Sequence, residues 1–140
     1  MSRIFWDTNL FIYLFEDYGR FSKAVVRLRS NMLERGDQLL TSTLTLGEIL
    51  VKPAERRDTA RCAHYERAIR SAAILIPFDV EAARKYADLR TDRAIKAPDA
   101  IQLACAAAAG TDLFITNDER LRGKHVTGIQ FIVQLERAPV

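Results

Sequence analysis

Cysteine and histidine are scarce in this chain, and their scarcity narrows the possible chemistry. The two cysteines, Cys62 and Cys105, lie 43 positions apart, and no CxxC or mixed Cys/His motif surrounds either of them. His64 and His125 are equally isolated. A transition-metal site built on sulfur or nitrogen is therefore not expected, and we interpret both cysteines as small core residues.

Long hydrophobic runs, linkers and repeats are also missing. The apolar stretch at the N-terminus is broken by Asp7 and Asn9 and has no small-residue cleavage site behind it, so neither a signal peptide nor a membrane-spanning helix is predicted. The 140 residues are 49% apolar and 28% charged, which is typical of a soluble globular domain with its own core. We expect one domain over residues 1–140, in the cytoplasm and away from membranes.

The excess of positive charge is mild, with 21 Lys and Arg residues against 18 Asp and Glu and a net charge of +3. If four of the acids belong to one site, the rest of the protein carries +7. Most of the bases are Arg, whose planar guanidinium binds phosphate through two hydrogen bonds. This balance is compatible with a nucleic-acid partner.

Short apolar runs alternate with longer amphipathic segments, which predicts an α/β fold with a parallel sheet covered by helices. Ser22, Asp79 and Asn117 are predicted N-caps, and Gly36 suits the left-handed residue after a helix. Strands are expected over residues 3–6, 38–41, 74–77, 113–116 and 130–133. Helices are expected over residues 7–16, 22–35, 45–50, 53–71, 79–93, 98–109 and 117–123, and the one over 98–109 is apolar enough to be buried.

Four acids, Asp7, Glu48, Asp99 and Asp118, each follow a predicted strand or lie in the first turns of a predicted helix. Because ligands bind at the carboxyl ends of strands in open parallel sheets, we expect these side chains to share one cleft. Each acid also has an ordinary alternative: the aspartates can stabilise helix N-termini, and Glu48 can form a capping box with Thr45. The cap fits Asp7 least, because apolar residues flank it on both sides.

Four carboxylates in one cleft require protons or cations. Two ionised carboxylates ~4 Å apart repel by roughly 4 kcal/mol at an effective dielectric of about 20. Hard divalent cations prefer oxygen ligands, so Mg²⁺ or Mn²⁺ is the expected occupant. A cation held in this way activates water and neutralises phosphate oxygens, which favours phosphodiester hydrolysis without a nucleophilic side chain.

The local sequences around these acids together resemble the PIN-domain ribonucleases, and most of all the VapC-like toxins of toxin-antitoxin pairs. The resemblance spans residues 3–133 and rests on DTN at 7–9, LGEI at 46–49, PDAIQLA at 98–104 and ITND at 115–118. It implies a three-layer sandwich with a central five-stranded parallel sheet, and Mg²⁺- or Mn²⁺-dependent cleavage of single-stranded RNA. The four acids would be the catalytic, metal-binding residues.

The resemblance also implies supporting residues. Asn9 and Thr116 would orient the acids or a metal-bound water through hydrogen bonds, whereas Thr8 is the variable middle residue of its motif and is assigned no role. Asp112 is a further candidate for this supporting set, or else a turn residue before its strand.

Partners follow from charge and from the resemblance. Arg93, Lys96 and Arg120 lie near the acids in sequence and are candidate contacts to RNA phosphates. VapC-like toxins are typically homodimers silenced by a small antitoxin, so a cognate antitoxin is expected. DNA would be reached only through that antitoxin, because the chain has no helix-turn-helix or zinc-finger pattern.

Two other functions remain open. A phosphotransfer enzyme of the haloacid dehalogenase type would phosphorylate Asp7, but such enzymes need a second aspartate where Asn9 stands. A non-catalytic PIN-fold binding module would instead act through a protein partner and cleave no RNA.

Overall fold

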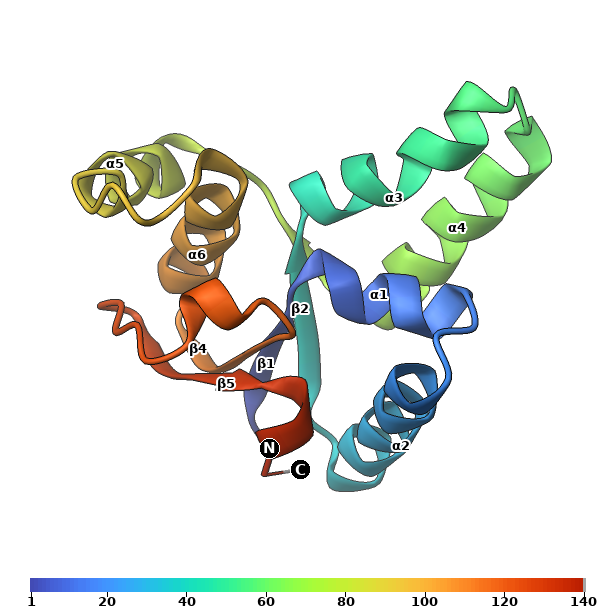
Figure 1. The fold of residues 1–140 in the computed structure, drawn as a ribbon, viewed down its shortest axis with the longest axis horizontal. Helices are drawn as coiled ribbons and strands as arrows, with labels where there is room; N and C mark the ends of the chain where they lie inside the picture. Colours follow the sequence, from blue (N-terminus) through green and yellow to red (C-terminus); the bar gives the residue numbers. More distant parts are fainter. Residues whose placement is uncertain (140) are drawn as a thin grey trace.

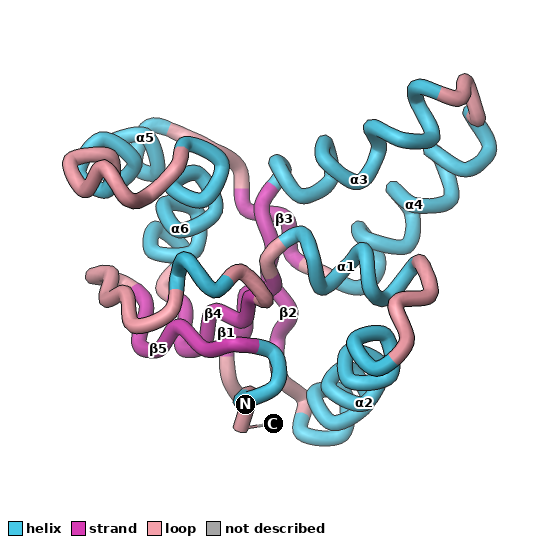
Figure 2. Tube along the Cα trace, in the orientation of Figure 1, coloured by secondary structure: helices cyan, strands magenta, loops and turns pink. Residues whose placement is uncertain are grey.

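The computed structural model describes residues 1–139, and its centre is an open parallel sheet with helices on both faces (Figures 1 and 2). The strands are β1 (Arg3–Trp6), β2 (Gln38–Ser42), β3 (Ile74–Ile76), β4 (Thr111–Thr116) and β5 (Ile129–Gln134). Their order across the sheet is β3-β2-β1-β4-β5, and every neighbouring pair is parallel. The predicted five-stranded α/β sandwich is confirmed.

The helices divide between the two faces of the sheet. One face is covered by α1 (Thr8–Phe15), α2 (Arg20–Arg35), α3 (Thr43–Glu55) and α4 (Thr59–Ala72), and the other by α5 (Val80–Leu89) and α6 (Ala97–Ala109). Two short 3₁₀ turns, η1 (Glu119–Leu121) and η2 (Leu135–Arg137), complete the described elements. None of the helices within residues 1–139 has both the length and the apolar character needed to cross a membrane.

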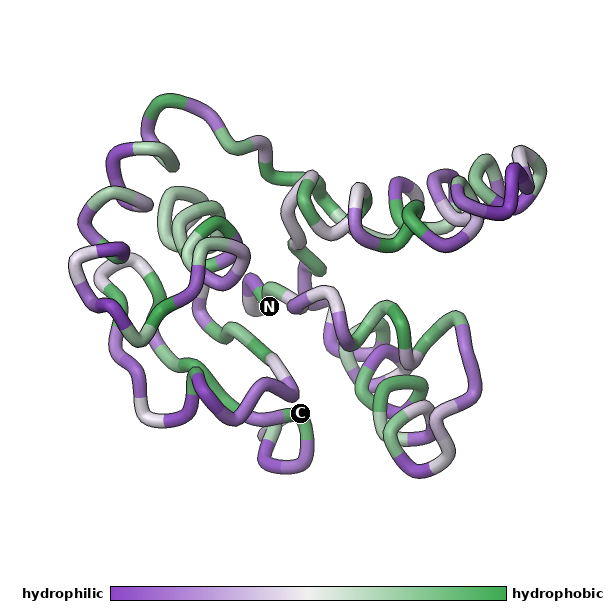
Figure 3. Tube along the Cα trace, turned by 45° about the horizontal axis from the view of Figure 1, so that its top comes forward, coloured by the Kyte–Doolittle hydropathy of each residue, from purple (hydrophilic) through white to green (hydrophobic). Residues whose placement is uncertain are grey.

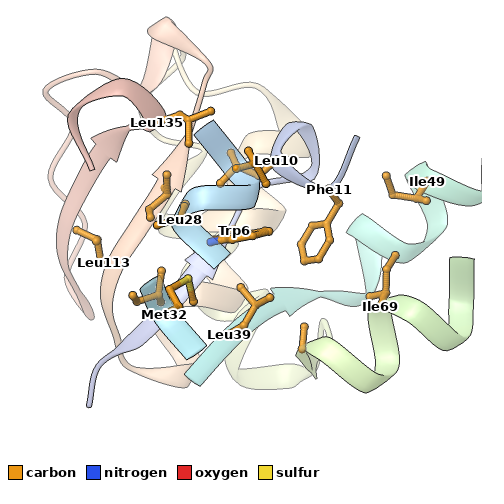
Figure 4. Close-up of a cluster of buried hydrophobic side chains, with 14 residues drawn as sticks. Trp6, Leu10, Phe11, Leu28, Met32, Leu39, Ile49, Ile69, Leu113 and Leu135 are labelled. Carbon is orange, nitrogen blue, oxygen red and sulfur yellow. The ribbon is translucent and has the colours of Figure 1, made fainter. Parts of the chain in front are cut away.

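Successive side chains of β1 point to opposite faces of the sheet and contribute to the hydrophobic core on each face. Trp6 points to the face of α1 and α2, where it meets Phe11 and Met32 in the cluster drawn in Figure 4. Phe5 points to the opposite face and stacks on Phe114 of β4, with ring centroids 5.1 Å apart. The centres of these strands, residues 4–6 of β1 and 113–115 of β4, are buried on both faces and are apolar for that reason. The turn between α3 and α4 is by contrast strongly hydrophilic (Figure 3, far right).

Several predicted helix ends are confirmed. Asp79 caps α5 by accepting a hydrogen bond from the backbone N–H of Ala82, and Gly36 adopts a left-handed φ of 73° after α2. The apolar α6 is buried, as predicted, and ends at Gly110 with a φ of 71°. Cys105 of this helix is a core residue, whereas Cys62 is only half-buried, so the core interpretation is wrong for that cysteine.

Other helix ends differ from the prediction. The helix α2 begins at Arg20, because the hydroxyl of Ser22 is used in the preceding turn, where it donates to the carbonyl of Glu16 and accepts from the N–H of Tyr18. Asp118, and not Asn117, caps the short turn η1. The helix α5 ends at Leu89, four residues before the predicted end.

Pro53 does not begin a helix. It lies in the last turn of α3, which runs without interruption to Glu55, and the next helix starts after Asp58, whose carboxylate accepts from the N–H of Arg61. A proline inside a helix lacks the N–H that would bond the carbonyl four residues earlier, and its ring crowds that carbonyl, so its cost falls on the preceding turn. The side chain of Pro53 is also buried, so packing favours continuing the helix through it.

Candidate active site

All four predicted acids lie at the carboxyl edge of the sheet. Asp7 directly follows β1, Glu48 lies in α3 after β2, Asp99 lies in the first turn of α6, and Asp118 is two residues beyond β4. Burial is the largest cause that raises the pKa of Asp7 and of Asp99. The charges of Asp99 and Glu48 add to it at Asp7, and those of Asp118 and Glu48 add to it at Asp99. Side chains that are 111 positions apart in sequence therefore share one electrostatic environment.

Asp7 is the most buried of the four, with only 8% of its surface exposed. Its Oδ1 accepts a hydrogen bond of 2.8 Å from the N–H of Thr8, so it does cap α1, and its Oδ2 accepts one of 2.7 Å from the Thr116 hydroxyl. Burial raises the pKa of Asp7 to about 6, against the opposing effect of these two hydrogen bonds. The capping alternative is correct but incomplete, since a cap alone does not require burial beside other acids.

Thr116 and Asn9 connect the ends of β1 and β4. The Thr116 hydroxyl donates to Asp7 and also accepts from the N–H of Asp118 at 3.0 Å, so a single hydroxyl joins two of the acids. Asn9 accepts from the N–H of Asn117 at 3.3 Å, which ties the start of α1 to the loop carrying Asp118. Thr116 thus orients the carboxylate of Asp7 directly, whereas Asn9 holds the backbone of Asn117, next to Asp118.

Glu48 reaches the site from an exposed position on α3. Its Oε1 accepts a hydrogen bond of 2.6 Å from the hydroxyl of Thr8. The capping-box alternative is wrong, because Ser42 caps α3 and Thr45 lies inside the helix. Sequence reasoning gave Thr8 no role, and only the approach of α1 to α3 reveals this contact.

Arg120 lies between the remaining two acids. Its Nη2 is 2.7 Å from Oδ2 of Asp118 and 3.5 Å from Oδ2 of Asp99. Hydrogen bonding to Arg120 lowers the pKa of Asp118. The pKa of Asp99 is raised, first by burial and then by the charge of Asp118, although Arg120 opposes this.

A family model for the PIN domain matches residues 4–125. The chain belongs to the PIN domain family. Three similar solved structures share its fold. VapBC2 from Rickettsia felis, bound to a promoter DNA fragment, has a TM-score of 0.74 at 14% identity, covering 94% of this chain and 97% of that one. DNA-bound VapBC from Salmonella typhimurium has a TM-score of 0.70 at 20% identity, covering 96% of this chain and 99% of that one. A toxin-antitoxin complex from Klebsiella pneumoniae has a TM-score of 0.63 at 25% identity, covering 94% of this chain and 100% of that one.

The comparison with curated proteins found no match. The family match and the similar folds confirm the resemblance drawn from the four sequence motifs. Members of the PIN family are generally nucleases.

One predicted supporting residue of this PIN domain lies elsewhere. Asp112 accepts a hydrogen bond of 2.8 Å from the N–H of Arg3, at the start of β1 and β4. With a rise of about 3.3 Å per strand residue, this position is roughly 13 Å from Thr116 along the strand. Asp112 therefore stabilises the opposite edge of the sheet, and its assignment to the site was wrong. The error arose because β4 begins at Thr111, two residues earlier than predicted.

The basic candidates differ in their surroundings. Arg93 and Lys96 are exposed in the segment between α5 and α6 that leads to Asp99. Arg120 is also largely exposed, but its guanidinium is already paired with two acids. A role for these three residues in RNA binding stays a prediction.

The donor set of the site fits a hard divalent cation. Its available ligands are carboxylates, with threonine hydroxyls behind them, and oxygen is the ligand atom that Mg²⁺ and Mn²⁺ prefer. Asp7 makes no ion pair with any residue of 1–139, so a cation would compensate its buried charge. Within this described part of the chain, no three Asp, Glu, His or Cys side chains surround a single point as they stand.

Proposed function

We propose that this PIN domain is a Mg²⁺- or Mn²⁺-dependent endoribonuclease that cleaves single-stranded RNA, and that it is the toxin of a toxin-antitoxin pair. One observation carries the proposal: four carboxylates from four separate segments lie at the carboxyl edge of the sheet, and Asp7, which makes no ion pair with residues 1–139, is buried there with its pKa raised first by burial and further by the charges of Asp99 and Glu48. Like charges are gathered in this way at a cost in stability, which a bound cation offsets.

The four acids would hold the cation, each from a differently constrained position. When bound, such an ion lowers the pKa of a coordinated water and neutralises the oxygens of the phosphodiester. Thr116 keeps Asp7 facing the site, and Thr8 does the same for Glu48. Arg93, Lys96 and Arg120 would contact the phosphates of the RNA.

An antitoxin partner is supported by the solved structures, two of which are VapBC proteins bound to DNA. The PIN domain has a cavity of about 120 Å³ beside Glu48, between α1, α3 and α4. Its lining combines Phe15 and Tyr65 with three bases, Lys52, Arg56 and Arg61, and two acids, Glu16 and Glu48. The excess of positive charge suits a segment bearing apolar and acidic residues. We propose that DNA is reached only through this partner, that the toxin is a homodimer, and that it acts in the cytoplasm.

Purified protein incubated with single-stranded RNA tests the nuclease. Cleavage is expected with Mg²⁺ or Mn²⁺, to stop when EDTA is added, and to fall to background in Asp7→Asn. The matched control is Asp112→Asn, an identical change at the opposite edge of the sheet, which should cleave like the wild type. Cleavage that survives both chelation and Asp7→Asn would contradict the proposal and indicate a contaminating nuclease.

The alternative is a non-catalytic binding module acting through a protein partner. The ion pairs of Arg120 favour it, because they neutralise Asp118 and part of Asp99 without any metal. A purified protein that binds an antitoxin tightly, yet cuts no RNA and takes up no Mn²⁺ in calorimetry, would establish this function instead. The phosphotransfer alternative is weaker, because Asn9 occupies the required second acid position and is bound to Asn117.

A further inference from the structure

A cluster of buried polar side chains lies directly behind Glu48. Gln102 of α6 is 2% exposed, although its neighbours in that helix are almost all apolar. It meets hydroxyl groups from α1, from β2 and from α3. We call this set the hydroxyl cluster, and its members are Thr8, Thr41, Ser42, Thr45 and Gln102.

The amide of Gln102 is held at both of its ends. Its Oε1 accepts a hydrogen bond from the hydroxyl of Ser42. Its Nε2 donates to the hydroxyl oxygens of Thr8, at 2.9 Å, and Thr45, at 2.8 Å. Both hydrogens of the amide nitrogen are therefore used, and the threonine hydroxyls act as acceptors toward Gln102.

Counting hydrogens at Thr8 shows why this orientation matters. A hydroxyl has one hydrogen, and an ionised carboxylate can only accept, so the 2.6 Å contact between Thr8 and Glu48 uses that hydrogen. With the amide reversed, the oxygen of Gln102 would face Thr8 and compete with Glu48 for the same hydrogen. The amide nitrogen leaves the hydrogen free for Glu48.

Glu48 depends on this contact more than the other acids depend on theirs. It is exposed, and the hydrogen bond from Thr8 is the only one its carboxylate makes with residues 1–139. Asp7 has two hydrogen bonds and Asp118 has Arg120. A long exposed side chain with no partner samples many rotamers, and one charge-assisted bond selects among them.

We infer that Gln102 is a positioning residue that acts on Glu48 through Thr8, by fixing the direction of the Thr8 hydroxyl. Because Glu48 is assigned to the site by the proposed function, the inference rests on that function. Gln102 lies three residues after Asp99 on α6, and this spacing places both on one face of the helix. The helix α6 thus supplies one acid directly and orients a second through Thr8.

A double-mutant cycle measured by Mn²⁺ calorimetry tests the inference. The variants are Thr8→Val, which removes the hydroxyl with little change of shape, Gln102→Met, and the two combined. Loss of a residue that orients a metal ligand typically costs about 10-fold or more in metal affinity, and we expect that from either single change. The double variant should bind like Thr8→Val alone, because Gln102 acts through Thr8. Thr8→Ser keeps the hydroxyl and should restore binding.

Controls separate positioning from general destabilisation. Thr43→Val and Gln130→Met make the same exchanges at exposed positions outside the hydroxyl cluster and should bind Mn²⁺ normally. Thermal melts identify variants that fail to fold. If Gln102→Met does not fold, the Thr8→Val and Thr8→Ser pair still decides the matter, because equal affinities of those two overturn the inference.

The outcomes also distinguish the two proposals. Wild-type protein that binds no Mn²⁺ contradicts the proposed function and the inference with it. Normal binding by the wild type, together with normal binding by Thr8→Val or additive losses in the double variant, contradicts the inference alone.

Discussion

The two edges of the sheet use the same side chain in opposite ways. At the amino edge, Asp37 accepts a hydrogen bond of 2.9 Å from the N–H of Ser2 and pairs with Arg35, while Asp112 accepts from the N–H of Arg3. Each of these carboxylates has donors of its own. They join the start of β1 to the strands β2 and β4 on either side of it.

At the carboxyl edge, the acids affect one another's charge. Asp7 is almost fully buried and feels the charges of Asp99 and Glu48, and burial raises its pKa to about 6. A carboxylate whose hydrogen bonds compensate for its burial stabilises the fold. One whose pKa is raised by burial and by nearby acids destabilises the fold unless a cation binds beside it. Asp37 and Asp112 are thus bound by donors at the amino edge, whereas Asp7 combines its two donors with burial and a raised pKa.

The largest effect is expected from Asp7→Asn in metal-free protein. Asparagine keeps the helix cap through its single acceptor oxygen, so the change removes a buried charge and also the acceptor of the Thr116 hydroxyl, which lowers the gain. The difference between a pKa of 3.8 and one of about 6 corresponds to up to about 3 kcal/mol of added stability at pH 8. Urea unfolding in EDTA measures it. If Asp7→Asn were less stable than the wild type, Asp7 would stabilise the fold as the aspartates of the amino edge do, and the two edges would not differ.

The pH dependence of the wild type should follow from the same group. The folded pKa of Asp7 lies above its unfolded value, so the folded state binds more protons between pH 4 and 6. The contribution of Asp7 to stability is therefore favourable at low pH and falls as pH rises through that window. Urea unfolding of wild type and Asp7→Asn at several pH values should diverge between pH 4 and 6 and run parallel above it.

A smaller change of opposite sign is expected at the amino edge. Asp37→Ala leaves the N–H of Ser2 and the guanidinium of Arg35 without their acceptor, which should cost about 2 kcal/mol. Mn²⁺ binding and RNA cleavage should be unchanged, because Asp37 lies at the other end of the strands. If its loss impaired cleavage in a protein that remains folded, the two edges would not be independent.

The smallest effect on stability is expected from Arg120→Gln, because the guanidinium is exposed. Removing this positive charge beside Asp118 and Asp99 should raise Mn²⁺ affinity several-fold and raise the KM for RNA. Arg122→Gln is the matched control, since Arg122 pairs only with Glu119 among residues 1–139. Unchanged Mn²⁺ affinity in Arg120→Gln would show that the guanidinium does not compete with the cation.

The sequence by itself determined the elements and the choice of acids. The strands were predictable from short apolar runs, such as residues 4–6 of β1 and 113–115 of β4, which are buried on both faces. Two helix ends were predictable because Gly36 and Gly110 adopt left-handed conformations. Asp7, Glu48, Asp99 and Asp118 could be chosen because position after a strand indicates the carboxyl edge. All of these signals lie within a few residues of the feature that they predict.

Tertiary structure decided the strand order, the pairing of Arg120 with Asp118 and Asp99, and the contacts of the hydroxyl cluster. The bond from Thr8 to Glu48 spans 40 positions and that from Gln102 to Thr8 spans 94. Such contacts depend on how helices pack across the carboxyl end of the sheet, four residues along β4 from Asp112. Neighbouring residues specify local backbone preferences, but only the packed core fixes which distant polar groups meet.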